Sequence, residues 1–219
     1  MRLLVISDFH GSVEAAHRAA AKAKRMQIDA IVVCGDITHF GSVKDAEKIL
    51  APLIKLDMPV LYVPGNCDSA ELAEAKITGA TNIHGQCQKI NDVSFMGLGA
   101  APTSRFYSWF EMSETKIMNT LEQIADRCSP NKWLAVVSHA PPKATSVDLA
   151  FSRMHAGSVS LRDFIEKKEP DIVFCGHIHE AKGVDRIGNT VIVNPGPVRH
   201  GNCAIATFDD KIEVKLDSV

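Results

Sequence analysis

Apolar runs that are hydrophobic at every position, and not only at alternate positions, dominate the first third of the chain. The predicted strands at 2–7, 30–34 and 59–63 contain such runs, and glycine and polar residues follow each of them. Between the runs, apolar residues recur at helical spacing after Ser12 and after Ser42. Strands that are apolar on both faces and alternate with helices are typical of a mostly parallel sheet covered by helices. The opening of the chain is therefore predicted to be a β-α-β-α-β unit.

The middle of the chain predicts further elements of both kinds. In order, these are a turn at 90–93, a strand at 94–98, a helix around 117–128, a strand at 133–138, a helix around 161–165 and a strand at 171–175. The segment 140–157 has no clear period, and loops of that length in compact domains tend to be functional.

The pattern changes after His179. Residues 187–190 lie between two strand-like segments, and residues 203–216 form a last hairpin pattern around Asp209 and Asp210. This tail is predicted to be an antiparallel sheet. Two sheets packed face to face, with helices outside them, accommodate both halves of the chain. Because no linker separates the halves, residues 1–219 are predicted to form a single domain of the α/β class.

Composition places the chain among ordinary soluble globular proteins. It has 219 residues, of which 46% are hydrophobic and 23% are charged, enough for one well-cored domain. The net charge of -2 argues against a protein that grips a nucleic-acid backbone non-specifically. No apolar run approaches the length of a membrane span, and the N-terminus enters a strand at once, so neither a membrane segment nor a signal peptide is expected.

The six cysteines are too few and too scattered for a disulfide framework. Cys34 and Cys175 end apolar strands, where reduced cysteine behaves as a small hydrophobe. These features predict an intracellular, reducing location, with the cytoplasm as the default.

Five of the predicted strands are followed by residues that can bind a metal. These are Asp8 and His10, Asp36, Asn66, His139, and the pair His177 and His179. Each residue alone has an ordinary alternative role, as a helix cap, a turn residue or a core histidine. Together they would gather beyond the carboxyl ends of the strands, where such sheets bind ligands. Several carboxylates and imidazoles in one crevice are costly unless a cation holds them together.

The number of donors exceeds what one tetrahedral ion needs. Two carboxylates, four imidazoles and one amide suit two divalent ions about 3.5–4 Å apart with a shared carboxylate between them. The mixture of nitrogen and hard oxygen, with no cysteine required, favours transition metals over calcium or magnesium. We expect manganese, with iron, zinc, nickel or cobalt as alternatives.

The ordered motifs resemble those of the calcineurin-like metallophosphoesterases. The motifs that carry the resemblance are Asp8-x-His10, Gly35-Asp36, Gly65-Asn66, Ser138-His139 and Gly176-His177-Ile178-His179, and the likeness extends to Asn194-Pro195-Gly196. The resemblance implies a four-layer α-β-β-α sandwich of two mixed sheets flanked by helices. It implies two ligand sets that share Asp36: Asp8, His10, Asp36 and His179 for one metal, and Asp36, Asn66, His139 and His177 for the other.

The activity that the resemblance implies is hydrolysis of a phosphoester. A hydroxide that bridges the two cations would attack phosphorus in line, while the cations neutralise charge on the phosphate oxygens. The side chain of Asn66 can bind metal through its oxygen and leave its NH2 group to donate to the phosphate. No covalent phosphoenzyme is needed, so the lack of an obvious serine or cysteine nucleophile is no objection.

One motif departs from the common pattern of the family. Where the family usually has Gly-Asn-His followed by an acid, this chain has Gly65-Asn66-Cys67-Asp68. A thiol is a poor substitute for an imidazolium as a proton donor. Chains with cysteine here resemble the small phosphodiesterases of the family. We therefore expect activity on phosphodiesters with good leaving groups and weak activity on alkyl monoesters. The alternative that Cys67 merely packs stays open.

Other residues near the motifs are secondary candidates. His39 is expected either to support a metal ligand or to supply the missing acid, with a plain loop histidine as the alternative. Arg199, His200 and His155 are candidates for substrate binding. His17 and His84 are assigned to the surface or to packing, and Ser158 to a helix N-cap.

Two rival functions stay open. The first is a metal-binding scaffold on the same fold that binds protein partners and has little or no activity. The second is a nuclease, against which the mild negative charge and the scarcity of Trp and Tyr argue. The expected partner is a small phosphodiester; nucleic acid and homo-oligomers are left open, and no membrane is expected. Specificity is expected to lie in segments 100–115 and 140–157.

Overall fold

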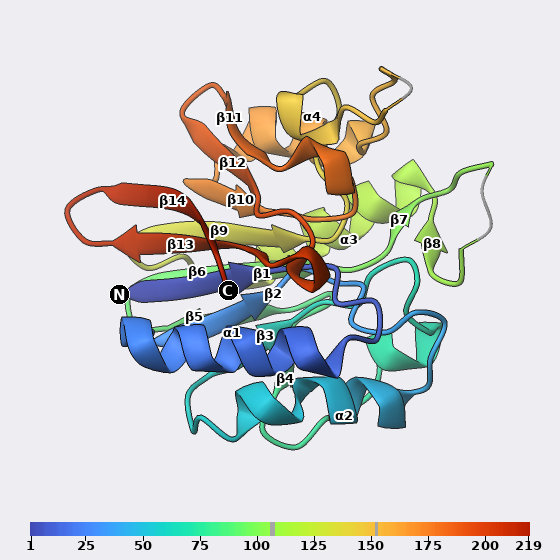
Figure 1. Ribbon diagram of the computed structural model, residues 1–219. Coiled ribbons are helices and arrows are strands. Elements are labelled where there is room, and N and C mark those ends of the chain that lie inside the picture. The colour runs from blue at the N-terminus through green and yellow to red at the C-terminus, as the bar shows by residue number, and fades with distance from the viewer. Residues whose placement is uncertain (106–107, 152) are drawn as a thin grey trace.

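Two six-stranded sheets pack face to face in the computed structural model, which describes residues 1–105, 108–151 and 153–219 (Figure 1). The first sheet has the strand order β14-β13-β1-β2-β3-β4. Its strands are β1 (Arg2–Ile6), β2 (Ala30–Val33), β3 (Val60–Tyr62), β4 (Thr81–Asn82), β13 (Asn202–Phe208) and β14 (Ile212–Ser218). Strands β1 to β4 are parallel, and β13 and β14 are antiparallel additions at one edge.

The second sheet has the order β11-β12-β10-β9-β6-β5. Its strands are β5 (Cys87–Ile90), β6 (Val93–Leu98), β9 (Trp133–Ser138), β10 (Ile172–Phe174), β11 (Gly183–Ile187) and β12 (Thr190–Asn194). Strands β6, β9, β10 and β12 are parallel, so this sheet is mixed as well. The short strands β7 (Ala101–Pro102) and β8 (Glu111–Met112) pair with each other.

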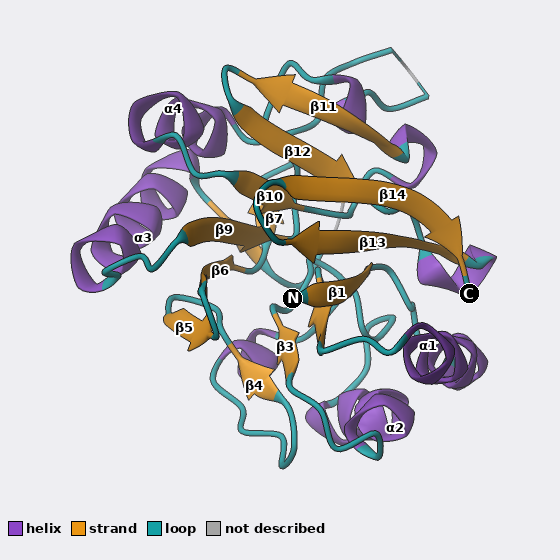
Figure 2. Cartoon of the chain, turned by 90° about the vertical axis from the view of Figure 1, so that its left-hand side faces the viewer, coloured by secondary structure: helices purple, strands orange, loops and turns teal. Residues whose placement is uncertain are grey.

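Helices cover the outer face of each sheet (Figure 2). The α-helices are α1 (Val13–Met26), α2 (Val43–Ile54), α3 (Glu114–Arg127) and α4 (Val159–Lys168), and the short 3-10 helices are η1 (Ala70–Ala73), η2 (Ser146–Asp148), η3 (His179–Ala181) and η4 (Val198–His200). Helices α1 and α2 pack on the first sheet, and α3 and α4 pack on the second. The predicted four-layer α-β-β-α sandwich is confirmed.

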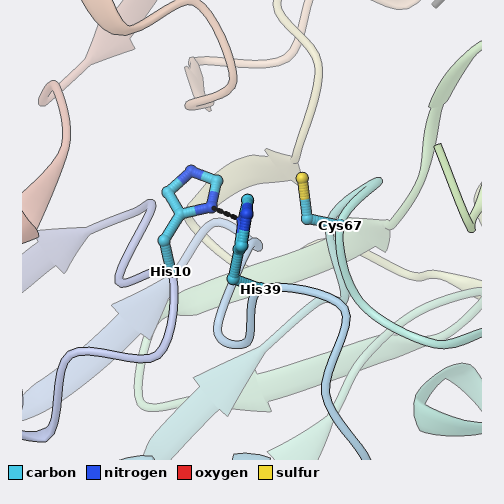
Figure 3. A group of neighbouring side chains, drawn as sticks. All are labelled: His10, His39 and Cys67. Carbon is cyan, nitrogen blue, oxygen red and sulfur yellow. Dashed lines mark hydrogen bonds between the residues drawn. The ribbon is translucent and has the colours of Figure 1, made fainter. Parts of the chain in front are cut away.

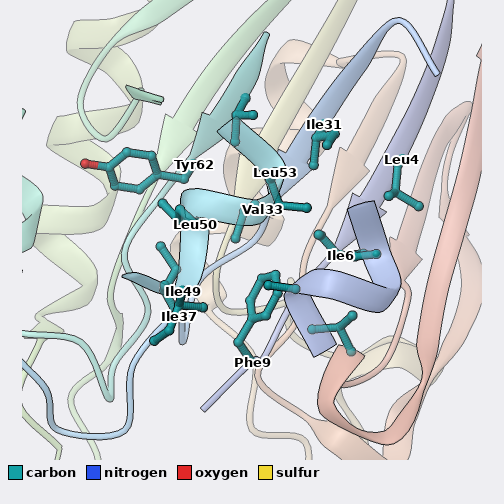
Figure 4. Packing of buried hydrophobic residues seen from close by; sticks show 14 of the residues in the cluster. Leu4, Ile6, Phe9, Ile31, Val33, Ile37, Ile49, Leu50, Leu53 and Tyr62 are labelled. Carbon is teal, nitrogen blue, oxygen red and sulfur yellow. The ribbon is translucent and has the colours of Figure 1, made fainter. Parts of the chain in front are cut away.

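The burial of both sheet faces explains the continuous apolar runs. In β1, Leu4 and Ile6 contact the α1–α2 layer, whereas Leu3 and Val5 point into the core between the sheets. Figure 4 shows the outer layer, in which Phe9 and the side chains of α2 pack against β1 and β2. A strand that is buried on both faces needs an apolar residue at every position.

The C-terminal tail differs from its prediction as one antiparallel sheet. Strands β11 and β12 form a hairpin on the second sheet, where β12 also runs parallel to β10. The β13–β14 hairpin instead joins the first sheet beside β1. The chain crosses between the sheets after Asn194, where Pro197 bridges to Ser7. The prediction missed this crossing because strand patterns do not identify the neighbouring strand.

One disulfide was not predicted from the sequence. Cys87 in β5 and Cys128 at the end of α3 are bonded, with their Cα atoms 5.6 Å apart. They are 41 residues apart in sequence, and only the packing of α3 on β5 brings them together. Cys34 and Cys175 are free and buried at strand ends, as expected.

No helix in the described ranges combines the length and the apolar character that crossing a bilayer requires.

The predicted long loop at 140–157 is organised around one buried carboxylate. Asp148 accepts hydrogen bonds from the backbone N–H groups of Ala144, Thr145 and Gly157, and His155 Nδ1 lies 2.6 Å from its Oδ1. The side chain of Asp148 is fully buried. These contacts hold residues 144–148 next to residues 155–157, although no apolar period runs through the loop.

Replacing Asp148 by Ala should therefore destabilise the fold. Backbone donors that lose a buried acceptor cost about 1–3 kcal/mol each, so we expect the free energy of unfolding to fall by about 3 kcal/mol in urea titrations. Asp163→Ala, at an exposed position of α4, is the matched control and should change it by less than about 0.5 kcal/mol. A loss below about 1 kcal/mol for Asp148→Ala would show that the loop does not depend on this carboxylate.

Candidate metal centre

Loops at the carboxyl ends of the strands bring the predicted metal-binding residues together. The loops after β1 and β2 are joined by backbone hydrogen bonds, from Asp8 N–H to the Gly35 carbonyl (3.0 Å) and from His10 N–H to the Asp36 carbonyl (2.9 Å). Asp8, His10 and Asp36 have φ values of 58°, 45° and 48°, in the left-handed region that residues other than glycine seldom adopt. Such strained conformations cluster at functional sites. Here they turn three side chains toward one point.

Two glycines allow this close approach. A Cβ atom at Gly65 would overlap the carboxylate of Asp36, and one at Gly35 would overlap the ring of His139. The glycines of the Gly35-Asp36 and Gly65-Asn66 motifs are thus explained by packing against the neighbouring motif.

Asp68 is a structural residue to which the sequence analysis gave no role. Its buried carboxylate accepts hydrogen bonds from the backbone N–H groups of Ile37, Thr38 and Gly65, and from the hydroxyl of Thr38. It therefore fixes the loop after β2 to the loop after β3. The acidic residue at the end of the motif Gly65-Asn66-Cys67-Asp68 was the sequence feature that could have indicated this role.

The first group of side chains consists of Asp8, His10, Asp36 and His179. The Nε2 atoms of His10 and His179 are 3.1 Å apart. Oδ1 of Asp8 lies 3.4 Å from His179 Nε2 and 3.9 Å from His10 Nε2. Oδ2 of Asp36 lies 3.6 Å from His10 Nε2. Two imidazoles and two carboxylates thus point at one small volume.

The second group contains Asn66, His139 and the other oxygen of Asp36. His139 Nε2 lies 2.9 Å from Asn66 Oδ1 and 3.4 Å from Asp36 Oδ1. The ring of His177 contacts that of His139, with centroids 5.0 Å apart. The carboxylate of Asp36 therefore lies between the two groups and presents one oxygen to each.

The histidine-containing loops are held by partners outside the two groups. His139 Nδ1 lies 2.8 Å from the Cys34 carbonyl, and because a carbonyl only accepts, Nδ1 carries the proton. The amide of Asn194 donates to the carbonyls of Gly176 and Ile178 and so fixes the loop that carries His177 and His179. Such fixation of ring and loop orientation is typical of metal ligands.

The chemistry of these donors fits a cation. His139 Nδ1 donates to the Cys34 carbonyl, so Nε2 is the ring nitrogen that faces the amide oxygen of Asn66 at 2.9 Å, and a cation between these two atoms would be bound by both. Asp8 Oδ1 is buried and has no hydrogen-bond partner within the described part of the chain. The imidazoles of His179 and His10 face this oxygen at 3.4 and 3.9 Å, and a bound cation would satisfy it more fully than they do.

The pKa values of the site follow from burial and mutual charge. Burial, reinforced by the charges of Asp8 and Asp68, raises the pKa of Asp36 to about 6. Burial opposes ionisation of Asp8, but His179 and the other imidazoles outweigh it and lower the pKa of Asp8 to about 2. Burial lowers the pKa of His10 to about 4 and that of His177 to about 3. Both rings are therefore neutral at pH 7, the form that binds metals.

His39 and Cys67 lie at the edge of the first group (Figure 3). His39 is exposed, and its Nδ1 is 3.3 Å from Nδ1 of His10, the nitrogen that faces away from the first group. Burial, followed by the charge of Asp36, raises the pKa of the Cys67 thiol. The backbone N–H of Cys67 donates to Asp36 Oδ1 at 2.8 Å. The thiol is thus uncharged, while its backbone holds the shared carboxylate.

The three candidate substrate-binding residues fall in different places. Arg199 is exposed on η4. Burial is the main cause of the low pKa of His10, and the positive charges of His179 and Arg199 lower it further, so Arg199 adds positive charge near this ring. His200 is exposed beside Arg199. His155 Nδ1 lies 2.6 Å from Asp148 Oδ1, which ties the ring to that carboxylate, and a role in substrate binding stays a prediction.

The remaining minor assignments agree with the structure. His17 is exposed on α1, and His84 is half-buried and accepts a hydrogen bond from the backbone of Gly99. Ser158 is the N-cap of α4 and accepts from the Leu161 N–H group. Specificity segments 100–115 and 140–157 stay predictions, and residues 106, 107 and 152 within them lie outside the described residues.

Comparison with known proteins supports the resemblance to the calcineurin-like family that the sequence motifs indicated. Residues 1–210 match the model of the calcineurin-like phosphoesterase superfamily domain. The uncharacterized protein MJ1162 of Methanocaldococcus jannaschii is 38% identical over 90% of this chain and 88% of its own length. A probable cyclic nucleotide phosphodiesterase of Vesicomyosocius okutanii is 24% identical over 80% of this chain and 72% of its own.

A solved structure shares the fold across the whole chain. A dimetal phosphatase from Danio rerio superposes with a TM-score of 0.70, covering 100% of this chain and 96% of its own at 14% identity. The match of the family model over nearly the whole chain agrees with the fold and with the clustered side chains. This protein belongs to the calcineurin-like phosphoesterase superfamily.

Proposed function

We propose that this protein is a phosphodiesterase that uses two divalent transition-metal ions. The observation that carries the proposal is the position of the Asp36 carboxylate. Its Oδ2 faces His10 Nε2 at 3.6 Å, and its Oδ1 faces His139 Nε2 at 3.4 Å. A carboxylate shared by two sets of donors is the arrangement that a two-metal site requires.

The residues divide into two proposed ligand sets that share Asp36. Asp8, His10, Asp36 and His179 would hold one ion, and Asp36, Asn66, His139 and His177 the other. Nitrogen mixed with hard oxygen favours manganese, with iron, zinc, nickel or cobalt as alternatives. Two such ions, when bound, supply positive charge for the phosphate oxygens and activate water for in-line attack.

The chain's own side chains would position the phosphate and handle the proton of the leaving group. Arg199 adds a positive charge at the exposed side of the site. The amide nitrogen of Asn66 lies 3.7 Å from Cys67 Sγ, a weak contact that a phosphate oxygen can replace. His39, exposed and next to His10, would either support that ligand or give a proton to the departing oxygen, and the second role would weaken the preference for diesters that follows from Cys67. The buried carboxylates of Asp8 and Asp36 are shielded from bulk water.

The preference for diesters rests on Cys67. A thiol whose pKa is raised by burial does not supply the proton that a poor alkoxide leaving group needs. Phosphodiesters with good leaving groups need that proton less. The relative named as a probable cyclic nucleotide phosphodiesterase supports a diester substrate. The alternative, a metal-binding scaffold without turnover, shares the fold and the ligand sets and differs only in rate.

Removing a shared or buried ligand should abolish hydrolysis. For Asp36→Ala and His139→Ala we expect kcat/KM on bis(p-nitrophenyl) phosphate with added manganese to fall about 100-fold or more, because charge stabilisation at the phosphate is lost. His17→Ala, on the exposed face of α1, is the control and should retain full activity.

Thermal unfolding of each variant separates loss of function from loss of fold. Folded Asp36→Ala or His139→Ala protein with unchanged activity would refute the proposed site. A wild-type protein that binds manganese and hydrolyses no phosphoester would favour the scaffold.

Introducing the imidazole that the motif lacks should change the preference between ester types. We expect Cys67→His to raise the ratio of kcat/KM for alkyl phosphate monoesters to kcat/KM for diesters about tenfold or more. The reason is that general acid catalysis contributes about 10²–10⁴-fold. Cys67→Ala removes the sulfur without adding an acid and should give no such gain. An unchanged ratio of monoester to diester rates in Cys67→His would show that position 67 only packs.

A further inference from the structure

We propose that a cavity beside the metal centre binds a planar aromatic group of the substrate, by stacking against Trp109 and Phe40. This inference rests on the proposed phosphodiesterase function and adds a substrate class to it, namely phosphodiesters that carry a nucleobase or an aryl ring.

The aromatic residues are attached to the loop that carries Asn66. The backbone N–H groups of Trp109 and Phe110 both donate to the Asn66 carbonyl, at 2.9 and 3.1 Å. The N–H of Phe40 donates to the Cys67 carbonyl at 2.9 Å. These backbone hydrogen bonds place Trp109 and Phe40 next to the loop that carries the proposed metal ligand Asn66. Asp68 fixes that loop by accepting from the N–H of Gly65.

A continuous series of ring contacts leads from the metal centre to these residues. The ring centroids of His10 and His39 are 5.3 Å apart, those of His39 and Phe40 are 4.9 Å apart, and those of Phe40 and Trp109 are 5.1 Å apart. Figure 3 shows the first step, with the ring of His39 beside that of His10. A substrate whose phosphate lies at the metal centre would therefore extend its organic group along an aromatic wall.

The wall borders a cavity of about 440 Å³. That volume lies in the range of small-molecule sites, which is about 300–1,000 Å³. Its lining includes Phe40, Trp109, Ser42, Ser69 and Glu71. Trp109 is 42% exposed, although a Trp side chain gains substantially from burial. A planar ring that stacks in the cavity would cover this exposed indole, and base–aromatic stacking is a recurrent mode of nucleotide binding.

Ser69, which lines the same cavity, has a side-chain hydroxyl that would favour a ligand with a polar edge. The Oγ of Ser69 is buried and has no hydrogen-bond partner among residues 1–105, 108–151 and 153–219. A buried hydroxyl without a partner is unfavourable, and a change of the Ser69 rotamer that turns it toward the cavity would let a ligand hydrogen-bond to it. Glu71, on the short helix η1 that Ser69 precedes, adds an acceptor. An apolar aryl ring uses neither group, whereas a nucleobase with amino and ring-nitrogen atoms uses both.

Binding of product-like monophosphates to the manganese-loaded protein tests the proposal without relying on turnover. Isothermal titration would compare adenosine 5′-monophosphate, phenyl phosphate and ethyl phosphate, which share the phosphate and differ in the attached group. We expect adenosine monophosphate to bind about tenfold more tightly than ethyl phosphate, from the contribution of stacking.

Substitutions at Trp109 and Ser69 identify the source of the gain. Trp109→Leu keeps an apolar side chain without a ring and should remove most of the gain, whereas Trp109→Phe keeps a ring and should retain most of it. Ser69→Ala should weaken binding of adenosine monophosphate and leave phenyl phosphate unchanged. Equal affinities for adenosine monophosphate and phenyl phosphate, both lost in Trp109→Leu, would support the aryl form of the proposal.

Two results would overturn the inference. One is an affinity for ethyl phosphate equal to that for adenosine monophosphate, and the other is unchanged binding in Trp109→Leu. Hydrolysis of ethyl p-nitrophenyl phosphate, measured in parallel, separates this outcome from failure of the proposed function. An active enzyme without the binding difference refutes the aromatic subsite alone, and an inactive protein with the difference refutes the diesterase function alone.

Discussion

The buried carboxylate of Asp36 is the constraint on which the rest of the site depends. It accepts the backbone N–H of Cys67, faces His10 with one oxygen and faces His139 with the other. Burial raises its pKa to about 6, so the ionised form is less stable here than in water and gains from a compensating positive charge. Side chains from both sheets converge on it. Positive charge bound on both sides of this carboxylate would offset its buried negative charge.

The backbone conformations that bring these side chains together have a local cost in conformational free energy. Four of the seven proposed ligands, Asp8, His10, Asp36 and His177, have positive φ values. Each such conformation costs about 1–3 kcal/mol, which the surrounding contacts must offset. Asp68 joins two loops of the first sheet, and Asn194 fixes the loop after β10 in the second. Hydrogen bonds that fix the loops carrying the proposed ligands keep a bound cation in a defined geometry.

The sequence was sufficient to predict the layers and the clustering of the proposed ligands. Continuous apolar strands required burial on both faces, and parallel strands required their carboxyl ends to share one edge, which brought Asp8 and Asp36 together. The crossing of the tail between sheets was missed because β12 and β13 look alike in pattern yet pair with different neighbours. The Cys87–Cys128 disulfide was missed for a related reason, because it depends on how α3 lies against β5.

The surroundings of the site were less predictable than the site itself. No period in the sequence places Trp109 beside Phe40, because both are positioned by hydrogen bonds to the loop that carries Asn66 and Cys67. Asp148 joins the two ends of its loop by accepting backbone hydrogen bonds from Thr145 and Gly157, which leave no hydrophobic pattern in the sequence. Residues that act through the backbone of distant loops become visible only in three dimensions.

Anomalous diffraction from crystals of the manganese-loaded protein tests the central claim most directly. The account predicts two manganese peaks about 3.5–4 Å apart, one on each side of the Asp36 carboxylate. One peak would lie among Asp8, His10 and His179, and the other among Asn66, His139 and His177. A single peak that Asp36 does not contact, or no peak near Asp36 at saturating manganese, would contradict it.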